Sequence, residues 1–146
     1  MNILVSACLL GVNCRYDGTG KLSPAVHTLL ATHHLIPFCP EVYGGLGIPR
    51  APAEICGGRV LTASDEDVTA QYEAGAREAL LLAELCNCKL AILKERSPSC
   101  GHGMVHDGSF TGRLTEGDGI TAALLAANGI TVIGDSEIEA YFKENE

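Results

Sequence analysis

The sequence predicts an α/β fold, namely a single three-layer Rossmann-like domain with a mostly parallel sheet and long functional loops. Short apolar runs alternate along the chain with segments of helical pattern, and this alternation is typical of parallel strands covered by helices on both faces. The chain has 146 residues, of which 47% are hydrophobic. Because this length suits one core and the sequence shows neither a linker nor an internal repeat, we expect one domain over residues 1–146.

The predicted strands are short runs rich in Ile, Leu and Val, as expected for strands that are buried on both faces of a parallel sheet. In chain order they cover residues 2–7, 35–39, 59–62, 89–94 and 130–133. Pro37 lies within the second run. Because proline has no N–H to donate to a neighbouring strand, this run is expected at a sheet edge or at a strand start. The Asp107-Gly108 pair predicts an additional hairpin.

The predicted helices are indicated by their end signals and by apolar stripes. They cover residues 24–33, 68–85, 120–127 and 136–143. Ser23 followed by Pro24 gives an N-cap and a proline at the first helical position. The acidic segment 64–67 precedes the alanine-rich second helix, where negative charge stabilises a helix N-terminus. Asn128-Gly129 is a stop signal for the third helix.

Glycine-rich segments predict the loops, at residues 9–22, 40–58, 97–103 and 112–119. The second of these is long for a compact domain, and loops of such length are commonly functional. Its apolar residues Leu46, Ile48 and Ile55 argue against disorder. Ligands of open parallel sheets bind beyond the carboxyl ends of the strands, so we expect the functional site among these loops.

The composition excludes several classes of protein. The formal net charge of -8 argues against a duplex nucleic-acid binder, because phosphate contacts need a basic face. The first residues lack the basic region of a secretion signal, and no run approaches the roughly 18 apolar residues of a membrane span. We therefore expect a cytoplasmic protein. In that compartment thiols stay reduced, and cysteines are more often metal-binding or catalytic than disulfide-bonded.

Three of the seven cysteines are associated with predicted strand ends. Cys8 and Cys39 come at the ends of two strands, and Cys100 lies in the loop that follows another. Polar residues accompany these thiols, namely Ser6, Glu41, Ser97, Ser99 and His102. Thiols that are far apart in the sequence but meet at one edge of a sheet predict a cluster or a metal site. Cys56, Cys86 and Cys88 lie beside apolar segments and are interpreted as core residues.

Three thiolate ligands from separate loops would suit an open metal site. Iron–sulfur clusters are held by thiolates, and three ligands would leave one iron of a four-iron cluster without a protein ligand. Such an open position accepts a substrate or water and can act as a Lewis acid. Glu41, just past a strand end, is a candidate base.

Two other classes of protein are compatible with the same residues. A zinc-binding structural module could use Cys39, Cys100 and His102. A metal-free cysteine-dependent hydrolase or redox enzyme could use one activated thiol, such as Cys100 in its glycine-rich loop.

Several segments, in the same order, resemble the thiouracil desulfurase family, which was formerly catalogued as a domain of unknown function. They are Ser6-Ala7-Cys8-Leu9-Leu10-Gly11, Cys14-Arg15-Tyr16-Asp17-Gly18, Cys39-Pro40-Glu41, Gly44-Gly45-Leu46, Pro49-Arg50, Leu93-Lys94-Glu95, Ser97-Pro98-Ser99-Cys100-Gly101 and Asp107-Gly108 with Phe110 and Gly112. The resemblance runs from Val5 to about Gly134, which is nearly the whole chain.

The resemblance implies a 4Fe–4S cluster held by Cys8, Cys39 and Cys100, with Glu41 and Ser97 as an acid/base pair. It further implies a desulfurase that hydrolyses the C–S bond of thiouracil or a related thiolated pyrimidine and releases sulfide without net redox change. Cys14 belongs to a family motif as well, so the resemblance leaves open whether Cys14 replaces one of the three ligands. It implies a small thiolated base as the partner and does not distinguish a free base from a nucleoside or an RNA base.

Overall fold

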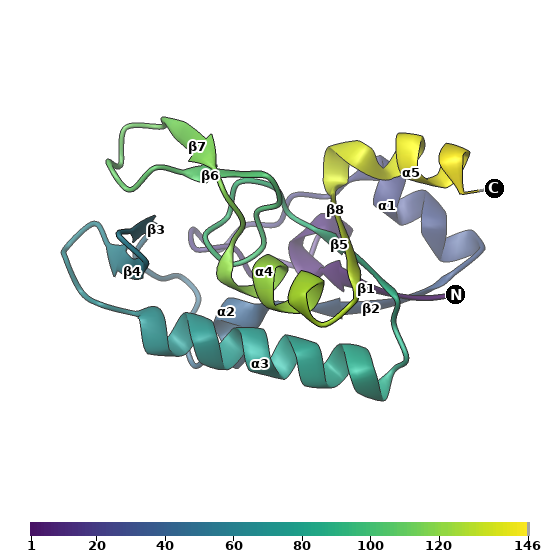
Figure 1. Ribbon diagram of the computed structural model, residues 1–146, viewed down its shortest axis with the longest axis horizontal. Helices are drawn as coiled ribbons and strands as arrows, with labels where there is room; N and C mark the ends of the chain where they lie inside the picture. Colours follow the sequence, from purple (N-terminus) through teal and green to yellow (C-terminus); the bar gives the residue numbers. More distant parts are fainter. Residues whose placement is uncertain (146) are drawn as a thin grey trace.

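Four short apolar strands pair side by side at the centre of the computed structural model, which describes residues 1–145 (Figure 1). They are β1 (Asn2–Ser6), β2 (His34–Phe38), β5 (Leu90–Leu93) and β8 (Thr131–Gly134), in the sheet order β2-β1-β5-β8. All three pairings are parallel. The predicted α/β class with a parallel sheet is confirmed. Glu146 lies outside the described residues, and the assignment of residues 1–146 to one domain stays a prediction.

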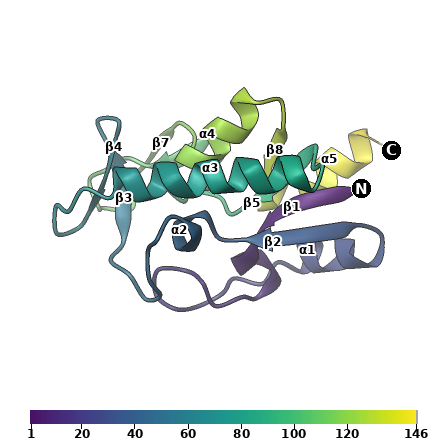
Figure 2. The same ribbon diagram turned by 90° about the horizontal axis from the view of Figure 1, so that it is seen from below.

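The sheet lies between two layers of helices (Figures 1 and 2). Successive side chains of a strand pack against opposite layers. On one face, Leu4 and Leu93 pack in a core with α3 (Thr69–Leu85) and α4 (Ile120–Ala127). On the other face, Ile3 and Ile92 pack in a core with α1 (Pro24–Thr28) and α5 (Ile138–Glu144). Because both faces of the sheet are covered, every residue of β5 is buried, which explains why the strands read as continuous apolar runs.

The Ser-Pro start of the first helix and the Asn-Gly stop of the third act as predicted, whereas the first turn of α3 contains no acidic residue. Two helices are shorter than expected. The Ser23 hydroxyl accepts a hydrogen bond from the Val26 N–H at 3.3 Å, and Pro24 occupies the first turn. The helix predicted over 24–33 continues only as a 3₁₀ turn, η2 (Leu29–Ala31), because the chain must turn to enter β2. A second 3₁₀ turn, η3 (Asp135–Glu137), replaces the start of the last predicted helix.

The segment predicted as a loop over 40–58 contains regular structure, so that prediction was wrong in part. Residues Pro40–Tyr43 form the short helix α2, in which proline takes a first-turn position and Glu41 is the acidic residue of that turn. Residues Ala53–Cys56 form β3, which pairs with β4 (Arg59–Thr62) in an antiparallel hairpin separate from the main sheet. The two-residue turn Gly57-Gly58 has positive φ at both positions, which glycine adopts without strain.

A second hairpin follows the predicted Asp107-Gly108 signal. It pairs β6 (Met104–His106) with β7 (Leu114–Glu116), and β7 lies in a segment that was predicted as loop. The buried carboxylate of Glu54 in β3 accepts hydrogen bonds from the N–H groups of Gly108 (3.0 Å) and Phe110 (3.2 Å). This contact joins the two hairpins beside the carboxyl end of the main sheet.

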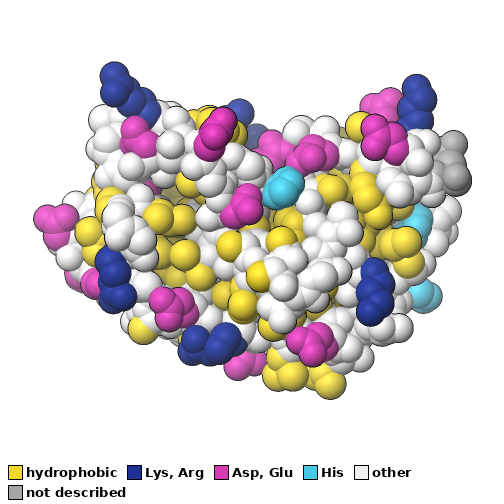
Figure 3. Space-filling model, in the orientation of Figure 1, with side chains coloured by type: hydrophobic (Ala, Val, Ile, Leu, Met, Phe, Trp, Pro, Cys, Tyr) yellow, Lys and Arg dark blue, Asp and Glu magenta, His cyan; other side chains and the backbone are white. Residues whose placement is uncertain are grey.

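The surface carries charged side chains of both signs. On the face shown in Figure 3, acidic and basic side chains are interspersed, with hydrophobic groups between them. Within residues 1–145, no helix combines the length and the apolar character that crossing a membrane requires.

Candidate active site

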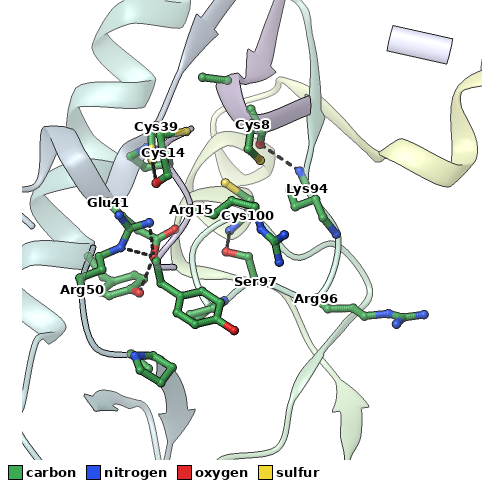
Figure 4. Close-up of a pocket in the computed structure, with 18 of the residues that line it drawn as sticks. Cys8, Cys14, Arg15, Cys39, Glu41, Arg50, Lys94, Arg96, Ser97 and Cys100 are labelled. Atoms are coloured by element: carbon green, nitrogen blue, oxygen red, sulfur yellow. Dashed lines mark hydrogen bonds and ion pairs between the residues drawn. The ribbon is translucent and has the colours of Figure 1, made fainter. Parts of the chain in front are cut away.

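A cavity of about 470 Å³ opens beyond the carboxyl ends of β1, β2 and β5 (Figure 4). The five residues that the resemblance implied as cluster ligands or as the acid/base pair all line it: Cys8, Cys39, Glu41, Ser97 and Cys100. The three strands are neighbours in the sheet, so their carboxyl ends meet at one edge. The cavity thus lies at the edge of the sheet where the sequence predicts the functional site.

The four thiols of the cavity come from three strand ends. Cys8 lies in the 3₁₀ turn η1 (Ala7–Leu10) directly after β1, and Cys14 lies in the loop that follows. Cys39 is the N-cap residue of α2, directly after β2, and Cys100 lies in the loop after β5. In Figure 4 the sulfur atoms of Cys8 and Cys100 point toward one another, and Cys14 and Cys39 lie together. All of these thiols are free.

The surroundings of Cys14, Cys39 and Cys100 raise the pKa of each thiol and so favour the protonated forms. Burial raises the pKa of the Cys100 thiol to about 12. A hydrogen bond to the Cys14 thiol, together with burial, raises the pKa of Cys39 far above its ordinary value. The same bond lowers the pKa of Cys14, but a hydrogen bond with Cys8 and burial outweigh it, and the pKa of Cys14 is raised overall. Because metal ligation requires thiolates, metal loading of this site releases protons and depends on pH.

Glu41 reaches the cavity from the first turn of α2 and is held by two other side chains. Its Oε2 atom accepts a hydrogen bond from the Tyr72 hydroxyl at 2.7 Å. The same atom lies 3.3 Å from both Nε and Nη2 of Arg50. The Glu41 and Arg50 side chains are 14% and 7% exposed, so the ion pair is largely shielded from solvent.

Ser97 organises the turn that carries Cys100. Its Oγ atom accepts hydrogen bonds from the N–H groups of Ser99 and Cys100, both at 3.0 Å. Behind this turn, the buried hydroxyls of Ser99 and Thr121 bond to each other at 2.8 Å. Both acceptor positions of the Ser97 hydroxyl are used and no group within residues 1–145 accepts its hydrogen, so the hydroxyl can donate at the cavity.

Comparison with known proteins identifies the family of the chain. Residues 3–137 match the family model described as 2-thiouracil desulfurase. The chain belongs to the 2-thiouracil desulfurase family. Among its relatives is the protein YbbK of Bacillus subtilis (strain 168), described as uncharacterized, which is 43% identical over 93% of this chain and 97% of the relative.

A solved structure supports the same family assignment. The chain is similar to the structure described as the [4Fe-4S]-dependent thiouracil desulfidase TudS (DUF523Vcz), with a TM-score of 0.90 and 45% sequence identity. The similarity covers 95% of this chain and 93% of that chain. The resemblance inferred from the sequence motifs, and the α/β fold that it implied, are confirmed.

The desulfurase-family cavity contains functional candidates that the sequence did not single out. Tyr72 and Arg50 bond to Glu41, and the basic side chains of Arg15, Lys94 and Arg96 also line the cavity. Arg50 belonged to a recognisable family segment, but its partner was not predictable from the sequence. A tyrosine in an alanine-rich helix is typical of core packing, so Tyr72 gave no functional signal.

The arrangement does not suit the zinc alternative. His102 lies outside the cavity, and its Nδ1 is 3.5 Å from Oδ1 of Asp118. Among the described residues, no three His, Cys, Asp or Glu side chains converge closely enough to hold a single metal ion. A four-iron cluster has a different requirement, because each cysteine binds a different iron and the ligand sulfurs lie further apart than around one ion.

Proposed function

We propose that this protein is a 4Fe–4S-dependent desulfurase that hydrolyses the C–S bond of thiouracil or a related thiolated pyrimidine and releases sulfide. The observation that carries the proposal is the convergence of Cys8, Cys39 and Cys100 on one cavity that also contains Glu41 and Ser97. Family membership and the similarity to a [4Fe-4S]-dependent thiouracil desulfidase support it over a zinc module and over a metal-free cysteine enzyme.

The donor set fits such a cluster. Cys8, Cys39 and Cys100 would hold it, since thiolates are the ligands of iron–sulfur clusters and each thiol faces the cavity from a different strand end. We assign Cys14 to a supporting role, because it lies in the loop beyond η1 and its carbonyl oxygen accepts a hydrogen bond from the Cys39 thiol at 3.8 Å. When bound, the cluster supplies an iron without a protein ligand, which can act as a Lewis acid toward the sulfur of the substrate.

The protein groups supply the acid/base chemistry. Glu41 accepts a proton from a water molecule, whose oxygen attacks the carbon of the C–S bond. The Ser97 hydroxyl assists proton movement as the tetrahedral intermediate collapses, using the hydrogen that its backbone contacts leave free. The carbon keeps the water oxygen and the sulfur leaves as sulfide, so neither atom is oxidised or reduced and no electron donor is needed.

The cavity volume, the net charge and the free thiols support a proposal about the substrate and the cellular compartment. Its volume of about 470 Å³ falls within the range of small-molecule sites. We infer a small thiolated base as the partner rather than a nucleic acid, in line with the net charge of -8. The free thiols at the site suit the reducing cytoplasm.

Metal analysis combined with an assay tests the proposal. Protein reconstituted anaerobically with iron and sulfide is incubated with 2-thiouracil, and iron, acid-labile sulfide and released uracil are measured. We expect four irons and four sulfides per chain, with uracil and sulfide formed in equal amounts. One zinc per chain without sulfide would support the structural module, and alkylation-sensitive turnover without metal would support the cysteine enzyme.

A further inference from the structure

The two carboxylate oxygens of Glu41 have different surroundings. Oε2 takes the hydrogen bond from Tyr72 and both contacts from Arg50. Among residues 1–145 no side chain or backbone group bonds to Oε1, and Oε1 is not among the buried atoms that lack a partner. One oxygen is therefore fully engaged, whereas the other is free and accessible from the cavity.

The two groups that hold Oε2 are themselves fixed. Tyr72 is only 2% exposed and packs in the core beneath the β3-β4 hairpin. Nη1 of Arg50 donates to the carbonyl oxygen of Gly47 at 3.2 Å, and the Arg50 N–H donates to the carbonyl oxygen of Tyr16 at 2.8 Å. Tyr72 and Arg50 cannot move with the Glu41 carboxylate if it rotates, so their contacts hold Oε2 in one position.

The backbone beneath Glu41 is equally constrained. A Cβ at Gly44 would come within 2.0 Å of the carbonyl oxygen of Gln71, so α2 lies directly on α3. Gln71 precedes Tyr72 on α3, so this contact fixes the distance between the Glu41 backbone and the Tyr72 hydroxyl.

We propose that Tyr72 and Arg50 are positioning residues, which hold Oε2 of Glu41 and thereby direct Oε1 at the water that attacks the substrate. The inference rests on the proposed role of Glu41 as the base. Orientation of a reacting group is worth large rate factors, and a displacement of about 1 Å can cost on the order of 100-fold in rate. A carboxylate that has lost one of its two holders samples more orientations and presents Oε1 correctly for less of the time.

Steady-state kinetics of the cluster-loaded protein test this inference. For Tyr72→Phe we expect kcat for 2-thiouracil to fall about 10-fold while KM stays within twofold, with iron content and visible spectrum unchanged. The kcat of Arg50→Ala should fall at least as far. Arg50→Lys should recover part of this loss in kcat, because the lysine restores one donor to Oε2. Tyr43→Phe is the matched control, since this tyrosine ends α2 but is exposed, and its kcat should be unchanged.

A double-variant cycle separates this inference from the proposed function. If Glu41→Gln keeps wild-type turnover, the role of Glu41 as base is wrong and the proposed mechanism fails. If Glu41→Gln loses most of its turnover but Tyr72→Phe and Arg50→Ala keep kcat within twofold, only the positioning inference is overturned. Tyr72→Phe should also leave the residual rate of Glu41→Gln unchanged, and a further 10-fold loss there would show that Tyr72 acts independently of Glu41. Should Tyr72→Phe fail to fold, the Arg50 pair of variants decides the question.

Discussion

Gly75 of α3 lies directly under the carbonyl oxygen of Pro40 in α2: a Cβ at this position would come within 1.9 Å of that oxygen. Real Cβ atoms do not approach a carbonyl oxygen so closely, so any side chain at residue 75 must displace one of the helices. Pro40 separates the proposed ligand Cys39 from the proposed base Glu41. The close contact at Gly75 therefore fixes where α2 packs on α3, and with it the positions of Cys39 and Glu41.

Gly75→Ala is expected to lower both stability and activity. Overpacking of a tight contact typically costs about 1–3 kcal/mol, and here the displaced segment carries Glu41. Urea unfolding should show the loss of stability, and kcat should fall at least 10-fold. Gly47→Ala is the matched control, because residue 47 is exposed and its added Cβ would lie 3.9 Å from the nearest atom. Equal stability of the two variants would contradict the close contact.

The ligand assignment predicts which thiols are required for iron. After anaerobic reconstitution, Cys8→Ala, Cys39→Ala and Cys100→Ala should each lose the cluster, whereas Cys14→Ala should retain four irons. Iron and sulfide analysis with the visible thiolate-to-iron absorption measures this. Cys56→Ala is the control outside the cavity, where the Cys56 thiol bonds to the Gly108 carbonyl oxygen at 3.4 Å. If Cys14→Ala loses iron and one of the other three variants retains it, Cys14 replaces that cysteine as a cluster ligand.

The buried thiols predict that the cluster-free protein loses stability in alkali. An unfolded cysteine has a pKa near 8.5, whereas burial raises the pKa of folded Cys100 to about 12. Between these values the unfolded chain has lost a proton that the folded chain keeps, so the free energy of unfolding falls as pH rises. The slope for one thiol is about 1.4 kcal/mol per pH unit.

Urea unfolding of the cluster-free protein at pH 8 and pH 10 measures this slope. The slope should be smaller in Cys100→Ala than in the wild-type protein, because that variant lacks one of the buried thiols. Identical slopes would show that Cys100 titrates at its ordinary value in the folded protein.

Ser97 is expected to affect both iron retention and turnover. Ser97→Ala removes the acceptor for the N–H groups of Ser99 and Cys100, so the turn that carries a ligand is loosened. Leaving such partners unpaired costs about 1–3 kcal/mol. We expect faster loss of iron during gel filtration and a kcat at least 10-fold lower. Ser97→Thr keeps the hydroxyl and should restore iron retention, and failure to do so would argue against the turn as the cause.

The convergence of the thiols could be predicted from the sequence, but the residues that surround them could not. Cys8 and Cys39 come at strand ends, and neighbouring parallel strands end at the same edge, so their convergence followed from the order of elements. Glu41 was predicted as a candidate base just past a strand end, yet the helix α2 that orients it was predicted as loop. Four residues are too short for a helical period to show, so only Pro40 and Glu41 carried a signal.

The residues that the sequence missed depend on tertiary packing. Tyr72 reaches Glu41 only because α2 and α3 meet at two glycines, and no local pattern encodes that contact. The segment 59–62 has the apolar pattern of a sheet strand, but it pairs with β3 in a separate hairpin. The strand itself was predicted with these bounds, but short apolar runs do not reveal which strand they pair with.

The proposed ligands come from three strand ends that are distant in the sequence and adjacent in the sheet. A bound cluster would therefore act as a branched covalent cross-link, closing two long loops of the chain at a single point. Cross-links of this kind restrict the unfolded ensemble, as disulfides do in secreted proteins. Loss of iron would thus release a constraint on residues 8–100 as well as a reactive centre. We expect the cluster-free protein to be degraded by proteases and to aggregate before the cluster-loaded protein does.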